Sequence, residues 1–120
     1  MIRRGFVYRV ARVFRDPTVS RPLLVMTSDA RNLDARSPTV VGIPLTTSLK
    51  GGMYRVRIRK GEGGVRQTSE AACEQIVQVP KRNFIADQNG IVRPLGRRLD
   101  EAILDSVIDA VVNVISASAG

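Results

Sequence analysis

Five short runs rich in β-branched, aromatic or other apolar residues, separated by glycine, proline and polar turn residues, follow one another over residues 6–79 of this 120-residue sequence. Runs of this length and composition are typical of β-strands. The strands that they predict cover residues 6–14, 21–27, 39–46, 54–59 and 71–79. In the third run, Gly42 and Pro44 indicate a bulge or a sheet edge, because proline cannot donate to a strand ladder. Between the runs, we expect one helical turn capped by Ser28 or Asp29, and turns at 51–52, 61–64 and 87–90.

The C-terminal region has a different period. Apolar residues recur at helical spacing, and Asp100 and Glu101 fall in the first turn, where the helix dipole favours negative charge. We therefore predict a helix over about 99–115, with an apolar stripe made of Leu99, Ile103, Val107, Ala110, Val111, Val114 and Ile115. Strands followed by one helix predict a mainly β (α+β) fold in a single domain, 1–120. Its strands lie within about 6–80, in a small bent antiparallel sheet or barrel against which the helix packs.

The charge of the chain is strongly positive and unevenly distributed. Nineteen lysines and arginines against eleven aspartates and glutamates give a net charge of +8, and sixteen of the cations are arginines. Residues 1–60 carry +10 and residues 61–120 carry −2. Because the guanidinium group fits phosphate and stacks on bases, this distribution favours a nucleic-acid partner over mere solubility. A membrane surface is a weaker alternative, since no basic amphipathic helix is visible.

Two residue types limit the chemistry. The sequence has no histidine and one cysteine, Cys73. This excludes histidine-activated nucleophiles, histidine-containing metal sites, thiolate metal clusters and an internal disulfide. Catalysis would therefore use arginine, lysine, carboxylate, hydroxyl or backbone groups, and we expect neither a metal nor another cofactor. With no apolar segment of membrane-spanning length and no secretory signal, we expect a cytoplasmic protein.

Five segments carry a family pattern in order along the chain. They are Arg4-Gly5-x-Val7-Tyr8, Arg21-Pro22-Leu23-Leu24-Val25-x-x-Ser28-Asp29-Ala30-x-Asn32, Thr39-Val40-Val41-x-Ile43-Pro44-Leu45-Thr46, Ser69-x-Ala71-x-Cys73-Glu74-Gln75-Ile76 and Leu95-Gly96-Arg97. Together they resemble the MazF/PemK family of toxin endoribonucleases, over nearly the whole chain. The resemblance implies a small SH3-like barrel of antiparallel strands with a C-terminal helix, assembled as a homodimer.

The resemblance also implies an activity and its partners. It implies sequence-specific cleavage of single-stranded RNA, often mRNA, without a metal, and a cognate antitoxin whose acidic segment covers the RNA groove. In this family an arginine before the proline of the second strand and a threonine at the end of the third carry the chemistry, which points here to Arg21 and Thr46. Gln75 would lie close to the RNA.

The sequence departs from the family pattern in three places. Phe6 stands where an acidic residue is common, the loop over 15–20 lacks the usual glutamate, and the stretch 83–93 is longer than usual. These departures bear on the RNA sequence that is cut and on the antitoxin more than on the class of activity.

The chemistry suits a chain without histidine, because RNA can be cleaved by its own 2′-hydroxyl. That reaction gives a 2′,3′-cyclic phosphate and a 5′-hydroxyl, and it needs groups that orient the sugar and stabilise charge on phosphorus. Arg21 can stabilise that charge, and Thr46 can donate to a phosphoryl oxygen. Without the resemblance, both would be ordinary strand-end residues. Other groups that can contact RNA are Ser20, Thr47, Ser48, Lys50 and Gln75.

Several of these residues have a second interpretation. Gln75 can instead form a cross-strand hydrogen bond, and Glu74 suits a salt bridge better than a catalytic base. Alternation with Tyr54, Val56 and Ile58 places Arg55, Arg57 and Arg59 on one strand face. Each of these arginines fits a solvated face better than a specific contact, although together they should steer RNA. Cys73 is expected to be buried.

Two rival functions follow from the same fold. One is a CcdB-like toxin that binds DNA gyrase and cleaves nothing, against which the Ser/Ala-rich C-terminus without an aromatic anchor argues. The other is an RNA-binding barrel that has lost catalysis, which binding without cleavage would identify.

Overall fold

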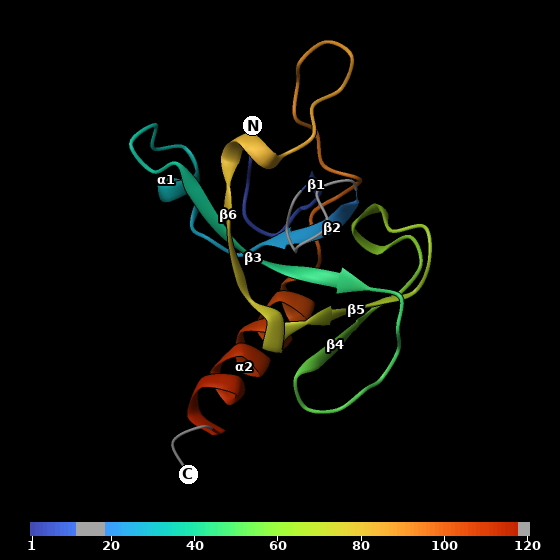
Figure 1. Ribbon diagram of the computed structural model, residues 1–120. Helices are drawn as coiled ribbons and strands as arrows, with labels where there is room; N and C mark the ends of the chain where they lie inside the picture. The colour runs from blue at the N-terminus through green and yellow to red at the C-terminus, as the bar shows by residue number, and fades with distance from the viewer. Residues whose placement is uncertain (12–18, 118–120) are drawn as a thin grey trace.

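The computed structural model describes residues 1–11 and 19–117. The strands are β1 (Val7–Ala11), β2 (Ser20–Val25), β3 (Thr39–Thr46), β4 (Arg55–Ile58), β5 (Ser69–Ala72) and β6 (Val77–Pro80). The α-helices are α1 (Asp29–Asn32) and α2 (Glu101–Ala117). Single 3-10 turns are η1 (Glu62–Gly64), η2 (Cys73–Gln75) and η3 (Lys81–Asn83). The mainly β fold with a C-terminal helix is thus confirmed (Figure 1).

All strand pairs are antiparallel, and β3 lies at the centre of the sheet. The strand order is β1-β2-β3-β5-β4, while β6 pairs with the first half of β3. β3 therefore has three partners: β2, then β6 over residues 39–42, then β5 over residues 45–46. Among the described residues this path does not return from β4 to β1, so the sheet is open and the implied barrel is not closed by strand pairing.

An apolar core lies on each face of the sheet. On one face, β-strand side chains such as Leu24 and Ile43 pack with Leu104 and Val107 of α2. On the other face, Tyr8, Leu23 and Phe84 form a second core, with the Tyr8 and Phe84 rings edge to face at 5.4 Å. Figure 1 shows α2 crossing beside β4 and β5, and α2 packs on both β4 and η2.

Several elements differ from the sequence-based expectations. The strand predicted over 71–79 is two strands, β5 and β6, separated by η2, because β5 pairs with β4 and β6 pairs with β3. The bulge or edge predicted at Gly42 and Pro44 is wrong, since both lie in the central strand. Gly42 leaves room there for Leu23: a Cβ atom on Gly42 would lie 2.7 Å from the Leu23 Cγ. Part of the strand predicted over 6–14 and of the loop over 15–20 falls outside the described residues.

The helices follow the predicted signals closely. Ser28 caps α1 by accepting a hydrogen bond from the Arg31 amide. α2 begins at Glu101 and ends at Ala117, against the predicted 99–115. The prediction that Ile115 belongs to the buried apolar stripe is wrong, because Ile115 is 66% exposed. The predicted stripe also omitted Leu104, which is fully buried. No helix in the described part of the chain has the length and apolar character to span a membrane.

Candidate nucleic-acid interface

A cleft of about 380 Å³ opens where the start of β2, the end of β3 and η2 meet. Its lining includes six of the nine residues that the sequence singled out, which are Arg21, Thr46, Ser48, Lys50, Arg55 and Gln75. Pro44, Leu45 and Ala72 supply the rest of the wall. Residues from four separate segments of the sequence thus converge on one hollow, which we call the candidate cleft.

The strand register places Arg21 and Thr46 together. Leu23 of β2 pairs with Pro44 of β3. Arg21 and Thr46 each lie two residues beyond this pair, in opposite chain directions on antiparallel strands, so they share one face near the same end. The Arg21 residue is exposed and Thr46 is half-buried. The Thr46 hydroxyl oxygen accepts a hydrogen bond from the Ser48 amide at 3.1 Å, which turns the chain away from β3.

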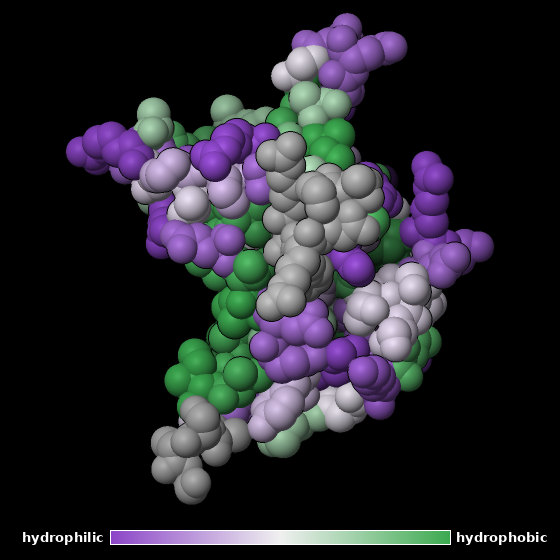
Figure 2. Space-filling view, in the orientation of Figure 1, coloured by the Kyte–Doolittle hydropathy of each residue, from purple (hydrophilic) through white to green (hydrophobic). Residues whose placement is uncertain are grey.

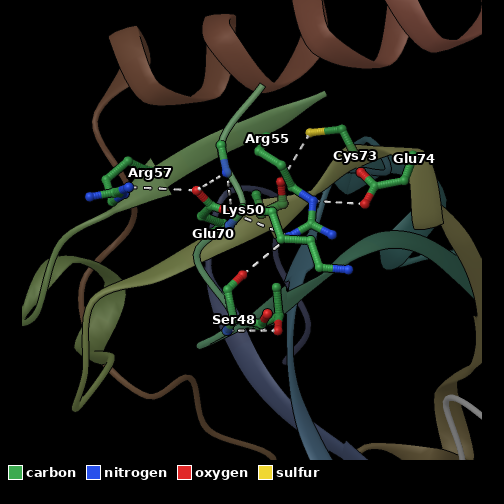
Figure 3. Close-up of polar contacts among 10 residues, drawn as sticks. Ser48, Lys50, Arg55, Arg57, Glu70, Cys73 and Glu74 are labelled. Carbon is green, nitrogen blue, oxygen red and sulfur yellow. Dashed lines mark hydrogen bonds and ion pairs between the residues drawn. The ribbon is translucent and has the colours of Figure 1, made fainter. Parts of the chain in front are cut away.

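A buried carboxylate organises the other wall. Glu70 of β5 is only 2% exposed. It accepts hydrogen bonds from the backbone amides of Lys50 at 2.9 Å and Gly51 at 3.0 Å, and from Nη1 of Arg55 at 3.2 Å. Arg57 Nη2 lies 3.6 Å from its second oxygen. Figure 3 shows Glu70 between Arg57 on one side and Lys50 and Arg55 on the other, so one side chain fixes both the 50–51 loop and a strand arginine.

These contacts decide the charge of Glu70. Burial raises the pKa of Glu70, but the hydrogen bonds from the Lys50 and Gly51 amides and from Arg55 outweigh burial, so the pKa lies below its ordinary value. Glu70 is therefore a carboxylate at neutral pH. It acts as a fixed anion that holds the donors around it.

Arg55 differs from the solvated strand face that the sequence predicted. Its side chain is only 9% exposed. Besides Glu70, its Nε donates to Glu74 Oε1 at 2.7 Å and its Nη1 donates to the Ser48 carbonyl at 3.3 Å. The salt bridge preferred for Glu74 is confirmed. Arg57, in contrast, has a side chain that is 51% exposed and does not line the candidate cleft.

Gln75 belongs to η2 rather than to the strand that the sequence predicted. It is exposed and lines the candidate cleft together with Arg21 and Thr46. The neighbouring Cys73 is buried as expected, and burial raises its pKa to about 11. Its thiol donates to the Ala71 carbonyl at 3.6 Å, so Cys73 is protonated at neutral pH and is no nucleophile.

Three singled-out residues lie outside the candidate cleft, namely Ser20, Thr47 and Arg57. The Ser20 hydroxyl accepts a hydrogen bond from Arg9 Nη1 at 3.2 Å. Thr47 lines a neighbouring cleft. Glu70 was not identified from the sequence. The one feature that could have indicated it is its place as a single acidic residue among the small residues of Ser69–Ala72.

The candidate cleft is cationic. It contains Arg21, Lys50 and Arg55, and no aspartate or glutamate lines it within the described residues. In the same part of the chain, no three cysteine, aspartate or glutamate side chains are grouped so that they could hold a metal ion. Positive charge, two hydroxyls and one amide suit a polyanion with base edges to contact.

Comparisons with known proteins identify a family and a shared fold. A family model described as "PemK-like, MazF-like toxin of type II toxin-antitoxin system" matches residues 9–115. A comparison with curated protein sequences gives no match. Among solved structures, an endoribonuclease from a Mycobacterial species, in complex with its cognate antitoxin, is similar with a TM-score of 0.73. It is 19% identical, over 97% of this chain and 96% of that one.

Two further solved structures have the same fold. The Mycobacterium tuberculosis toxin MazF-mt6 has a TM-score of 0.72 and 18% identity, over 92% of this chain and 95% of that one. A chain of a MazE–MazF crystal structure from Deinococcus radiodurans has a TM-score of 0.71 and 16% identity, over 95% of this chain and 94% of that one.

Proposed function

Because the chain belongs to the PemK-like, MazF-like toxin family of type II toxin–antitoxin systems, we propose that it is an endoribonuclease that cleaves single-stranded RNA, mRNA included, at a specific sequence. The observation that carries the proposal is the candidate cleft, in which Arg21 and Thr46 share one wall with Lys50, Arg55 and Gln75 close by. These groups can hold and polarise a phosphodiester by donating hydrogen bonds to its oxygens.

In the proposed reaction the RNA supplies its own nucleophile. The 2′-oxygen forms a bond to the adjacent phosphorus, and the bond from phosphorus to the 5′-oxygen breaks. The 2′-hydroxyl proton passes to solvent, and the 5′-oxygen takes up a proton from water. The products are a 2′,3′-cyclic phosphate and a 5′-hydroxyl, with no metal ion required.

Each residue of the candidate cleft has a role in this proposal. Arg21 stays charged and stabilises the negative charge that develops on the phosphoryl oxygens. The Thr46 hydroxyl donates to one of those oxygens and orients the phosphate for in-line attack. Lys50 contacts a neighbouring phosphate, and the amide of Gln75 contacts a base edge. Ser48 and Arg55 shape the wall, since the Arg55 guanidinium is engaged by two glutamates and a carbonyl. We propose that Ser20, Thr47 and Arg57, which lie outside this cleft, contact RNA that leaves it.

The proposal extends to protein partners. We propose a cognate antitoxin with an acidic segment that competes with RNA for the cationic cleft, in a cytoplasmic setting where mRNA is the substrate.

We also propose a homodimer. Ile108, Val112 and Ile115 lie exposed on α2, and Figure 2 shows hydrophobic surface over that end of the molecule. Analytical ultracentrifugation of the purified protein tests the homodimer: the measured mass should equal that of two chains.

The activity is tested by mapping the ends produced from a long mixed-sequence RNA in buffer containing EDTA. We expect the wild-type protein to cut at a defined short sequence. Arg21→Ala and Thr46→Val should lower the cleavage rate at least about a hundredfold, as loss of one transition-state donor does in other enzymes. Thr46→Ser, which keeps the hydroxyl, should retain most of the rate.

The matched control is Arg97→Ala, because Arg97 is also an exposed arginine but lines neither cleft. It should cut like the wild type. If the wild type cuts no RNA, or if Arg21→Ala cuts as fast as Arg97→Ala, the proposed activity or its assignment to Arg21 is wrong. RNA binding without cleavage would instead support the non-catalytic alternative.

A further inference from the structure

A second and larger cleft borders the candidate cleft. Its volume is about 570 Å³, and its lining includes Pro22 and Thr47, which follow directly after Arg21 and Thr46 in the sequence. Because consecutive Cα atoms are about 3.8 Å apart, the two clefts lie next to each other at the paired ends of β2 and β3. We call the larger one the second cleft.

The lining of the second cleft combines cations, hydrogen-bonding groups and an apolar wall. Arg9 and Arg66 are the charged residues, and no aspartate or glutamate lines the cleft within the described residues. Gln67, Thr47 and Ser69 are its other polar residues, and its apolar wall consists of Pro22, Val65 and Leu95. None of the ion pairs among the described residues engages Arg9 or Arg66. Their charge is thus not neutralised by a carboxylate of that part of the chain.

Backbone packing fixes the floor of the second cleft. The Leu95 amide donates to the Val7 carbonyl at 2.8 Å, which ties the 95–96 segment to β1. Gly64 has φ +85°, and a Cβ atom on it would lie 2.3 Å from the Leu95 carbonyl carbon. Only glycine allows this close approach. On the opposite rim, Arg9 Nη1 donates to the Ser20 hydroxyl at 3.2 Å. The segments around Gly64 and Leu95, which line the second cleft, are therefore held together and against β1.

Building on the proposed function, we propose that the second cleft binds a further nucleotide of the same RNA strand, beyond the scissile step. The apolar wall covers the face of a base, Gln67 and Thr47 contact its edge, and Arg66 and Arg9 contact the phosphate. An RNA strand is favoured over a peptide because the strand already lies in the adjoining candidate cleft. Binding in two adjoining cationic clefts adds contacts along one backbone.

The experiment measures binding separately from cleavage. Mixed-sequence RNA with 2′-O-methyl groups cannot undergo attack by a 2′-hydroxyl, so it reports affinity alone. Fluorescence anisotropy is measured with a short oligonucleotide that fills only the candidate cleft and with longer ones extended on the 5′ or the 3′ side. The variants are Arg66→Ala and Gln67→Ala, with Arg97→Ala as the matched exposed-arginine control. Thermal unfolding verifies that each variant is folded.

We expect the wild type to bind one of the extended RNAs more tightly than the short RNA. Arg66→Ala should weaken that binding about tenfold, the effect of losing one charge-assisted contact, and leave the short RNA unchanged. Gln67→Ala should weaken the same extended RNA by a smaller factor. Equal affinities of Arg66→Ala and Arg97→Ala for every length would overturn the second cleft as an RNA site.

The two proposals fail in different ways. Length-dependent binding that Arg66→Ala abolishes, in a protein that cuts no RNA, supports the second cleft and rejects the proposed activity. Cleavage by the wild type with no effect of Arg66→Ala on extended RNA rejects only the second cleft. A wild-type protein that binds no RNA of any length rejects both.

Discussion

Glu70 contacts two lining residues of the candidate cleft, Lys50 and Arg55, from outside the cleft. Its two oxygens receive the amides of the 50–51 loop and the guanidinium of Arg55, and Arg57 approaches from the open side. A buried carboxylate is stable only when such donors surround it. The position of Lys50 in the candidate cleft therefore depends on a residue that itself does not line the cleft.

Glu70→Gln tests this dependence through the free energy of unfolding. The amide keeps the shape but loses the charge that holds Arg55, so we expect a loss of about 3 kcal/mol, as for one broken partner of a buried ion pair. Glu101→Gln is the control, because Glu101 pairs with Arg98 on the surface. Its effect should stay below about 0.5 kcal/mol. Equal effects of the two variants in chemical denaturation would contradict the assigned role.

The free energy of unfolding of the wild type and of Glu70→Gln, measured over a range of pH, tests whether the ionised form of Glu70 stabilises the fold. The pKa of Glu70 is lowered in the folded state, so its stabilisation is present above the ordinary pKa of 4.5 and is lost as pH falls through the lowered value. The difference in unfolding free energy between wild type and Glu70→Gln should thus be constant at neutral pH and shrink in acid.

Among the elements, α2 packs against the two that carry Arg55 and Gln75 to the candidate cleft. It packs on β4, which carries Arg55, and on η2, which carries Gln75. Leu104 is fully buried in this contact, whereas Val112 on the same helix is 54% exposed.

Leu104→Ala should lower the free energy of unfolding by about 3 kcal/mol, because it leaves a cavity in a close-packed core. Asn113→Ala changes an exposed residue of the same helix and should alter the free energy of unfolding by about 0.5 kcal/mol or less. Thermal or denaturant unfolding of both variants checks the contrast. A Leu104→Ala protein as stable as Asn113→Ala would show that α2 is not anchored as described.

Local signals in the sequence predicted much of this architecture. The β-branched run bounded by Pro38 and by Thr47 predicts β3 over the residues that it occupies, and Ser28 predicts the cap of α1. The strand over 71–79 was not predicted correctly, because no glycine or proline marks η2 and the break arises from long-range pairing with β3 and β4. The role of Glu70 could not be predicted either, since its partners lie between 13 and 20 positions away in the sequence.

The lining of the candidate cleft was predicted only in part, because some of its contacts depend on residues that are distant in the sequence. Arg21, Thr46 and Gln75 follow from motif positions, and the structure places all three in one hollow. Whether an arginine of an alternating strand is solvated or buried depends on partners from another strand. Arg55 and Arg57 have the same pattern in the sequence, yet only Arg55 is enclosed, by Glu70 and Glu74.

At the scale of the whole molecule, charge separates two regions. Four of the eleven acidic residues, Asp100, Glu101, Asp105 and Asp109, lie in or directly before α2 and are exposed. Glu70 and Glu74 are engaged by arginines. Within the described parts of the chain, the charged residues that line the two clefts at the ends of β2 and β3 are all cations. A polyanion is thus attracted to the clefts and repelled by the outer face of α2.

In the proposed reaction the cut RNA supplies its own nucleophile to a site of arginine and hydroxyl groups. Two RNAs that differ by one oxygen atom test this: an all-ribose strand, and the same strand with a single 2′-deoxy sugar on the 5′ side of the mapped scissile phosphate. We expect that, in EDTA, the wild-type protein cuts the first strand to a 2′,3′-cyclic phosphate and leaves the second intact at that position. Cleavage of the deoxy-substituted position at the same rate would contradict the proposed reaction.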